Sequence, residues 1–182
     1  MKQIVEPIKS VKDINAVEDY LAKNNLRNRL IFAFGINTGL RVSDILNLNV
    51  SDVLNKTHIE IKEKKTGKYK KFPINGKLKK LLKEYLNGVK NTDKPLFISR
   101  KGYRLHRNQV YRFLNDACQN VGINVNIGTH TMRKTFGFFF YKKFKDVALL
   151  QKIFNHSSPS ITLRYIGISQ EEIDVSYNQF EL

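Results

Sequence analysis

Hydrophobic residues recur along this chain at the spacing of amphipathic helices. The first such run follows Ser10, a residue type that caps helix N-termini, and places Ile14 and Leu21 on one face. Gly39 is expected to end the second helix in a left-handed conformation, and Thr129 to cap the helix that starts there. The periodicity predicts further helices over about residues 27–37, 43–48, 78–89, 107–121, 129–144, 148–154 and 160–165.

Two short segments alternate between polar and apolar positions instead. Residues 58–63 and 69–74 follow this pattern, and Thr66-Gly67 lies between them, which predicts a β-hairpin. A further short strand is expected over residues 96–98. The predicted fold is therefore mainly α with a small antiparallel β-sheet, in the α+β class.

The length fits one domain over residues 1–182, with a core at about 10–170 and a less basic C-terminal tail at 167–182. The sequence has no run of about 18 apolar residues and no apolar stretch near Met1 that would form a signal peptide. Cys118 is the only cysteine, which excludes an intramolecular disulfide and fits a reducing cytoplasm. Because Cys118 lies on the apolar face of its helix, we expect it to pack in the core.

The charge balance is strongly basic. Thirty-two Lys and Arg residues against 16 Asp and Glu residues give a net charge of +16. Such a charge destabilises a compact fold by self-repulsion and favours a polyanionic partner, with nucleic acid foremost. An acidic membrane surface is the alternative partner, but no basic helix with a continuous apolar face supports it.

Five positions combine into a specific pattern of basic side chains and a phenol. His130 and Arg133 are three residues apart at the start of an apolar helix, so they share a face. His156 follows the end of the next predicted helix, and Tyr165 comes nine residues later. Upstream, Arg41 closes a Thr-Gly-Leu-Arg segment. Cations around a phenol are suited to cutting a phosphodiester without a metal ion.

Together these segments resemble the catalytic domain of tyrosine recombinases, the phage integrase family. The family has an acidic residue three positions after its first arginine, which corresponds to Asp44 here. Asn155 stands where the family usually has Gly, and because Asn also tolerates the left-handed conformation, the turn is expected to survive. The resemblance covers about residues 10–170 and implies the tyrosine recombinase catalytic-domain fold. Members of the family usually carry a separate core-binding domain ahead of the catalytic domain, and none is expected in this sequence. The sequence is then either a fragment of a longer recombinase or a minimal integrase, and both interpretations stay open.

The resemblance implies a role for each position. Arg41 and Arg133 would bind the non-bridging phosphate oxygens, and their planar guanidinium groups suit this geometry. Tyr165 would be the nucleophile, made accessible as a phenolate by a base and positive charge. His130 would place the phosphate or take the tyrosine proton, and His156 would donate a hydrogen bond to the phosphate.

The same resemblance implies roles for residues that orient Arg41, protonate the leaving group or contact DNA. Asp44 would orient Arg41. The family also carries a lysine on its hairpin that protonates the leaving 5′ oxygen, and Lys65 matches it best, with Lys68 as the second candidate. Further cations are expected to contact DNA, namely Lys64, Lys68, Lys70, Lys71 and Arg107.

The implied function is site-specific DNA recombination or integration through a 3′-phosphotyrosyl intermediate on double-stranded DNA. No cofactor and no metal ion are expected. Two alternatives remain open: relaxation of DNA by a type IB topoisomerase-like activity, and a basic DNA-binding module without catalysis. The tail at 167–182 carries Ile173, Val175, Tyr177 and Phe180 and is expected to mediate self-association on DNA. Tyr177 is also the late alternative to Tyr165 as nucleophile.

Overall fold

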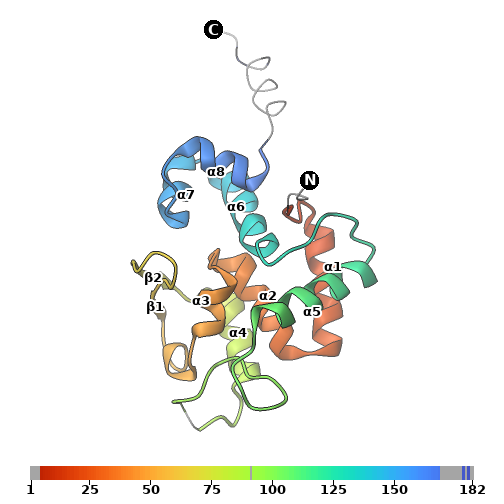
Figure 1. Cartoon of the computed structure of the whole chain (residues 1–182), viewed down its shortest axis with the longest axis vertical. Helices are drawn as coiled ribbons and strands as arrows, with labels where there is room; N and C mark the ends of the chain where they lie inside the picture. Colours follow the sequence, from red (N-terminus) through yellow and green to blue (C-terminus); the bar gives the residue numbers. More distant parts are fainter. Residues whose placement is uncertain (1–4, 91, 169–177, 179, 181–182) are drawn as a thin grey trace.

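The computed structural model describes residues 5–90, 92–168, 178 and 180. Over this part of the chain the fold is helical, with one two-stranded sheet at its edge (Figure 1). The elements in chain order are α1 (Val11–Asn24), α2 (Leu26–Thr38), α3 (Val42–Asn47), the 3-10 turn η1 (Val50–Asp52), β1 (His58–Lys62), β2 (Tyr69–Pro73), α4 (Gly76–Tyr85), α5 (Arg107–Asn120), α6 (Thr131–Phe144), α7 (Val147–Phe154) and α8 (Pro159–Ile166).

Helix α2 is the central element of the larger core. The five consecutive residues from Leu30 to Phe34 are all fully buried, because α1, α4, α5 and α6 pack around this helix. Ser10 caps α1 and accepts a hydrogen bond from the Asp13 backbone, as predicted. Gly39 ends α2 with φ at 63°, which confirms the predicted left-handed end and turns the chain into the segment that carries Arg41.

A second, smaller core joins α6, α7 and α8 around Leu150, Phe154 and Ile166. Gly137 makes this junction possible: a Cβ atom there would lie 2.6 Å from Ile166 and 2.7 Å from Phe154. Helix α8 ends at Gly167, whose carbonyl oxygen accepts a hydrogen bond from Lys9 Nζ at 3.0 Å. The N-terminal segment thus holds the end of the helix that carries Tyr165.

The hairpin is confirmed with an antiparallel register from His58 opposite Pro73 to Lys62 opposite Tyr69. Its turn is closed by two backbone hydrogen bonds, from Glu63 N to Lys68 O and from Gly67 N to Glu63 O, both 2.9 Å long. The hairpin lies beside α3 and below α7 in Figure 1.

Two sequence expectations about local structure are wrong. Residues 96–98 make no strand, because Ile98 forms only an isolated bridge with Arg104 while Phe97 packs fully buried in the core. Thr129 does not cap α6; His130 holds the N-cap position, and its side chain makes no capping hydrogen bond. The Thr131 hydroxyl instead accepts a hydrogen bond from Gly128 N, which forms a turn just before the helix.

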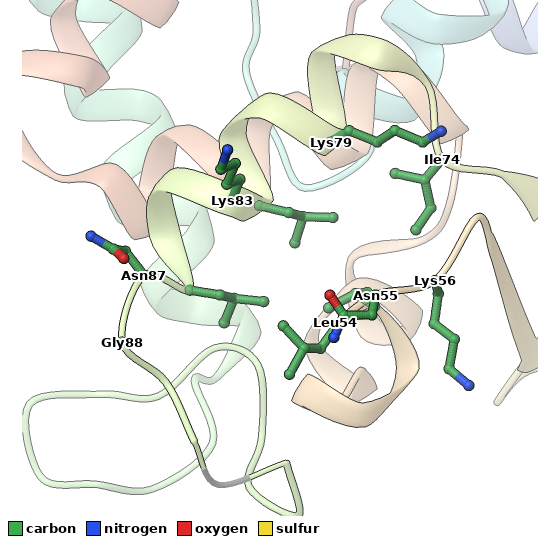
Figure 2. Close-up of a pocket in the computed structure, with 11 residues that line it drawn as sticks. Leu54, Asn55, Lys56, Ile74, Lys79, Lys83, Asn87 and Gly88 are labelled. Carbon is green, nitrogen blue, oxygen red and sulfur yellow. The ribbon is translucent and has the colours of Figure 1, made fainter.

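Away from the hairpin turn, a groove of about 430 Å³ opens between α4 and the segment after η1 (Figure 2). Its floor is apolar and includes Leu54 and Ile74. Lys56, Lys79 and Lys83 line it, so an apolar floor is combined with positive charge.

Candidate active site

Arg41 immediately precedes α3, at its N-cap position, and its side chain is 16% exposed. Its Nη1 atom lies 2.9 Å from Glu63 Oε2 and 3.9 Å from Asp44 Oδ2. Asp44 also accepts a hydrogen bond from the Lys64 backbone at 3.1 Å. Arg41 therefore lies between two buried carboxylates, and the nearer one comes from the hairpin.

Arg133 is buried on the first turns of α6, with 2% exposure. Its guanidinium donates one hydrogen bond to the Gly39 carbonyl and another to the Phe154 carbonyl, the latter 2.9 Å long. The guanidinium carbon also lies 4.3 Å from the centre of the Phe154 ring. These contacts fix the Arg133 side chain between the end of α2 and the end of α7.

Tyr165 lies on the last turn of α8, with its hydroxyl 3.2 Å from His130 Nδ1. Burial raises the pKa of Tyr165, and the positive charges of Arg133 and Arg41 only partly offset this effect. Desolvation, together with positive charges led by those of Arg133 and Lys134, lowers the pKa of His130. The sequence interpretation expected a base and the cations together to make the phenolate accessible; in this structure burial outweighs the effect of the cations on the pKa of Tyr165.

His156 packs against the nucleophile candidate, with its ring centre 5.0 Å from that of Tyr165. Its Nδ1 atom lies 3.1 Å from the Thr162 hydroxyl, which fixes the ring orientation. Asn155, which stands where the family usually has Gly, has φ at 56° and ψ at 46°. Its predicted left-handed conformation is therefore confirmed. This turn brings His156 back toward α8.

The hairpin lysines occupy different environments. Lys65 is exposed in the turn, and its charge contributes to the lowered pKa of His130. Lys68 Nζ donates a hydrogen bond to Asn155 Oδ1 at 2.6 Å. Lys70 points inward, between Glu63 and the Ile153 carbonyl.

The other cations expected to contact DNA lie on the surface. Lys64 and Lys71 are exposed, and Lys71 Nζ lies 2.7 Å from Glu60. Arg107 is exposed at the first position of α5. These DNA contacts stay predictions.

Sequence reasoning missed two residues next to the site, Glu63 and Lys134. Alternation along β1 puts Glu63 on the inward face with Ile59, so a charged residue at an inward position was the available signal. Lys134 is 8% exposed, and its Nζ atom lies 5.0 Å from the centre of the Tyr165 ring. Lys134 directly follows Arg133, but its burial depends on packing that a helical pattern does not specify.

Within residues 5–90 and 92–168, no group of three or more His, Cys, Asp or Glu side chains is placed to hold a metal ion. No helix in the same part of the chain is long and apolar enough to cross a membrane. The site brings together two guanidinium groups, two imidazoles and a phenol. Such a set can bind a phosphate and move a proton to or from the phenol.

Comparison with known proteins shows similarity to integrases and recombinases. The profile of the phage integrase family matches residues 8–172. The Bacillus subtilis protein named "Probable integrase/recombinase YoeC" is 46% identical over 177 residues, which is 97% of this chain and 97% of that protein. Tyrosine recombinase XerH of Campylobacter jejuni is 31% identical over 91% of this chain, and the chain spans 48% of its length.

Solved structures share the fold. The XerA recombinase structure superposes with a TM-score of 0.78 at 23% identity, over 98% of this chain and 64% of that one. The structure of XerH bound to a palindromic difH substrate, in a post-cleavage complex, gives 0.74 at 25% identity over 92% and 51%. A lambda integrase dimer bound to a COC' core site gives 0.73 at 16% identity over 93% and 63%. With the family profile and the YoeC relative both spanning nearly the whole sequence, this chain belongs to the phage integrase family.

Proposed function

We propose that this chain is a tyrosine-type DNA strand transferase that cuts and rejoins double-stranded DNA at specific sites through Tyr165. The observation that carries the proposal is the Tyr165 hydroxyl at 3.2 Å from His130 Nδ1, with Arg133 and His156 packed around the same phenol. A phenol beside a neutral imidazole and cations is suited to attack on a phosphodiester.

Each step of the proposed reaction forms one phosphoester bond and breaks another. The phenol oxygen of Tyr165 attacks phosphorus, its proton passes to His130, and the bond from phosphorus to the 5′ oxygen breaks. The products are a 3′-phosphotyrosyl link and a 5′ hydroxyl. A 5′ hydroxyl from a second strand then attacks the link, which releases Tyr165 and reseals the DNA. The covalent link conserves the bond energy, so the reaction consumes no ATP.

The two arginines neutralise the charge that develops on the phosphate oxygens. Arg133 donates hydrogen bonds to the Gly39 and Phe154 carbonyls, so its guanidinium is already oriented before a phosphate binds. Arg41 supplies the second guanidinium and His156 a further donor. Lys65 is the general acid for the leaving 5′ oxygen, supported by its position in the turn and by its electrostatic effect on His130.

A nicked suicide duplex, from which the cut fragment diffuses away, tests the proposal. The native chain should form a DNA adduct that survives denaturation. Tyr165→Phe should form none while still binding the duplex, since only the nucleophilic oxygen is lost. Tyr111→Phe, at an exposed tyrosine on α5, is the matched control and should keep the adduct. An adduct that persists in Tyr165→Phe would refute the assignment and direct the test to Tyr177.

The two alternatives give different results in the same system. A type IB topoisomerase-like enzyme would relax supercoiled plasmid as a monomer and would not exchange strands between duplexes. A DNA-binding module without catalysis would form no adduct at all. The match to named integrases and recombinases favours strand exchange between two duplexes.

Self-association on DNA involves the C-terminal tail. Residues 169–182 lie mainly outside the described part of the structure, and their sequence combines four carboxylates with apolar side chains such as Ile173 and Phe180. The lysine-lined apolar groove of Figure 2 offers a complementary surface on a neighbouring copy. Removing the tail, or replacing Lys79 and Lys83 by Glu, should weaken oligomers on DNA measured by gel filtration. Unchanged oligomers in both variants would refute this docking.

Because the proposed substrate is DNA, we expect the chain to act in the cytoplasm. The buried free thiol of Cys118 is compatible with that reducing compartment.

A further inference from the structure

Glu63 is a charged residue at a position where the hairpin faces the interior. It directly follows β1, and alternation puts it on the same side as Ile59 and Ile61. Glu63 is 1% exposed. A carboxylate this deeply buried is unfavourable unless cations and hydrogen bonds compensate for its lost hydration. The partners of Glu63 therefore indicate what the residue does.

Three side chains surround the Glu63 carboxylate. Arg41 Nη1 lies 2.9 Å from Oε2, and the Thr66 hydroxyl donates a hydrogen bond to the same oxygen at 2.7 Å. Lys70 Nζ lies 3.0 Å from Oε1. Thr66 and Lys70 both belong to the hairpin, whereas Arg41 precedes α3. Glu63 thus joins the hairpin to the arginine on the body of the domain.

The carboxylate stays ionised under all ordinary conditions. Burial alone would raise the pKa of Glu63, but hydrogen bonds with Thr66 and Lys70 and the charge of Lys70 lower it to about 2. Arg41 adds to this effect. Without the carboxylate, Arg41 and Lys70 would face each other as like charges, and Arg41 would lose its nearest anchor.

Asp44 provides less restraint on the same guanidinium. Its Oδ2 atom is 3.9 Å from Arg41 Nη1, which is an ion pair without hydrogen-bond contact. The other Asp44 oxygen accepts the Lys64 backbone N–H. Of the two acidic neighbours, Glu63 is therefore the one that restricts where the Arg41 side chain points.

We propose that Glu63 is a positioning residue that aims Arg41 at the scissile phosphate and makes that aim depend on a closed hairpin. This inference rests on the proposed function. Lys70 extends the connection, because its amino group also donates to the Ile153 carbonyl near the end of α7. The hairpin, Arg41 and the segment before His156 are then held in one arrangement by a single carboxylate and its partners.

Cleavage of the nicked duplex at saturating protein tests the proposal with Glu63→Gln, which keeps the size of the side chain and removes its charge. We expect the cleavage rate to fall about 10- to 100-fold, since misplacing a reacting group by about 1 Å costs on the order of 100-fold. Duplex affinity, measured separately, should be almost unchanged. Glu63→Asp should give an intermediate rate, because the charge remains but its reach is shorter by one methylene.

Glu60→Gln is the matched control. Glu60 lies on β1, three residues before Glu63, and pairs with Lys71 at 2.7 Å, but both side chains are exposed. Its replacement should leave the cleavage rate unchanged. An equal rate in Glu63→Gln and the native chain would overturn the proposal. If Glu63→Gln does not fold, Glu63→Asp decides, and a native rate in that variant would overturn the proposal equally.

A duplex with sulfur at the 5′ bridging position separates action through Arg41 from action through the hairpin lysine. A thiolate leaves without protonation. This duplex should therefore restore cleavage in a variant that lacks the general acid, but not in a variant that lacks charge neutralisation at the phosphate. The Glu63→Gln defect should therefore persist on this duplex. Full rescue would show that Glu63 acts only through Lys65. If the native chain itself forms no adduct, the proposed function fails; a native adduct with no Glu63 effect refutes this inference alone.

Discussion

The Tyr165 hydroxyl lies 3.2 Å from His130 Nδ1, and the pKa values of the two side chains are displaced in opposite directions. Burial raises the pKa of Tyr165, whereas desolvation and nearby cations lower the pKa of His130. At neutral pH both side chains are therefore uncharged, and in the tautomer that carries its proton on Nε2 the imidazole accepts a hydrogen bond from the phenol. The pair is prepared for proton transfer at the moment of attack, and it does not store a phenolate beforehand.

This pairing predicts an acid limb in the pH profile of cleavage. Because the pKa of His130 lies below 6.5, the imidazole stays neutral at pH 7 and becomes unable to accept the proton only at lower pH. The single-turnover rate should be level near neutrality and fall as pH drops well below 6.5. His130→Gln should lose this limb and about 100-fold or more in rate. His58→Gln, at an exposed histidine, should keep both; an unchanged acid limb in His130→Gln would contradict the assignment.

Arg133→Ala should affect both catalysis and stability. Removing one donor to a developing oxyanion costs roughly 3–4 kcal/mol, so cleavage should fall by more than about 100-fold. The Gly39 and Phe154 carbonyls would also lose their donor inside the protein, at about 1–3 kcal/mol for each group left unpaired. Urea titration and adduct formation measure the two effects. Arg164→Ala, an exposed position on α8, is the control; native stability in Arg133→Ala would show that the buried contacts contribute little.

Lys65→Ala should be rescued by the sulfur-containing duplex, and Arg133→Ala should not. The reason is that a thiolate leaving group needs no proton, whereas the phosphate oxygens still need neutralising charge. Lys68 is held by Asn155 at 2.6 Å, so Lys68→Ala should produce a smaller defect without rescue. Rescue of Lys68→Ala, with native cleavage in Lys65→Ala, would move the general acid to Lys68.

Glu63 should stabilise the fold at neutral pH and lose this effect in acid. Its folded pKa of about 2 lies below the ordinary 4.5, so its stabilisation is complete above about pH 4.5 and disappears as pH falls through about 2. At about 1.4 kcal/mol for each pKa unit, the effect is on the order of 3 kcal/mol. The difference in unfolding free energy between the native chain and Glu63→Gln should shrink accordingly between pH 5 and 2. A constant difference would show that another group titrates.

Duplex binding should depend steeply on salt. Twice as many basic as acidic residues favour contacts to phosphate, and each phosphate contacted lowers the slope of log affinity against log salt by about 0.9. The phosphate contacts should strengthen binding to unrelated duplexes to a similar extent, because they carry no sequence information. A titration at several salt concentrations measures both. Tight, salt-insensitive binding to one sequence would contradict this.

The sequence predicted most helices because each presents an apolar face to a common core. It also predicted the left-handed Asn155, since few residue types tolerate that conformation. It did not predict the cap of α6, because Thr131 forms the competing turn with Gly128. Residues 96–98 have a strand-like composition, but in the described part of the chain Ile98 forms only an isolated bridge with Arg104.

The limits of prediction are clearest at the site. Motif spacing and the family resemblance pointed to Arg41, Arg133 and Tyr165, which the structure brings close together, while their catalytic roles stay predictions. Glu63 was obscured by the lysines around it, and its importance arises from a contact with a residue 22 positions earlier in the chain. Helical periodicity likewise gives no reason for the burial of Lys134 beside Tyr165.

The end of α8 has a consequence for dynamics. The nucleophile candidate lies on the final turn of this helix, and Lys9 is the side chain that holds the Gly167 carbonyl behind it. Final turns generally open at smaller free-energy cost than buried helices, so we expect the turn that carries Tyr165 to open more readily than the core around Arg133. Amide hydrogen exchange should accordingly be fast at the end of α8 and slow around Arg133. Fraying of one helical turn would then be enough to disarm the enzyme without unfolding it.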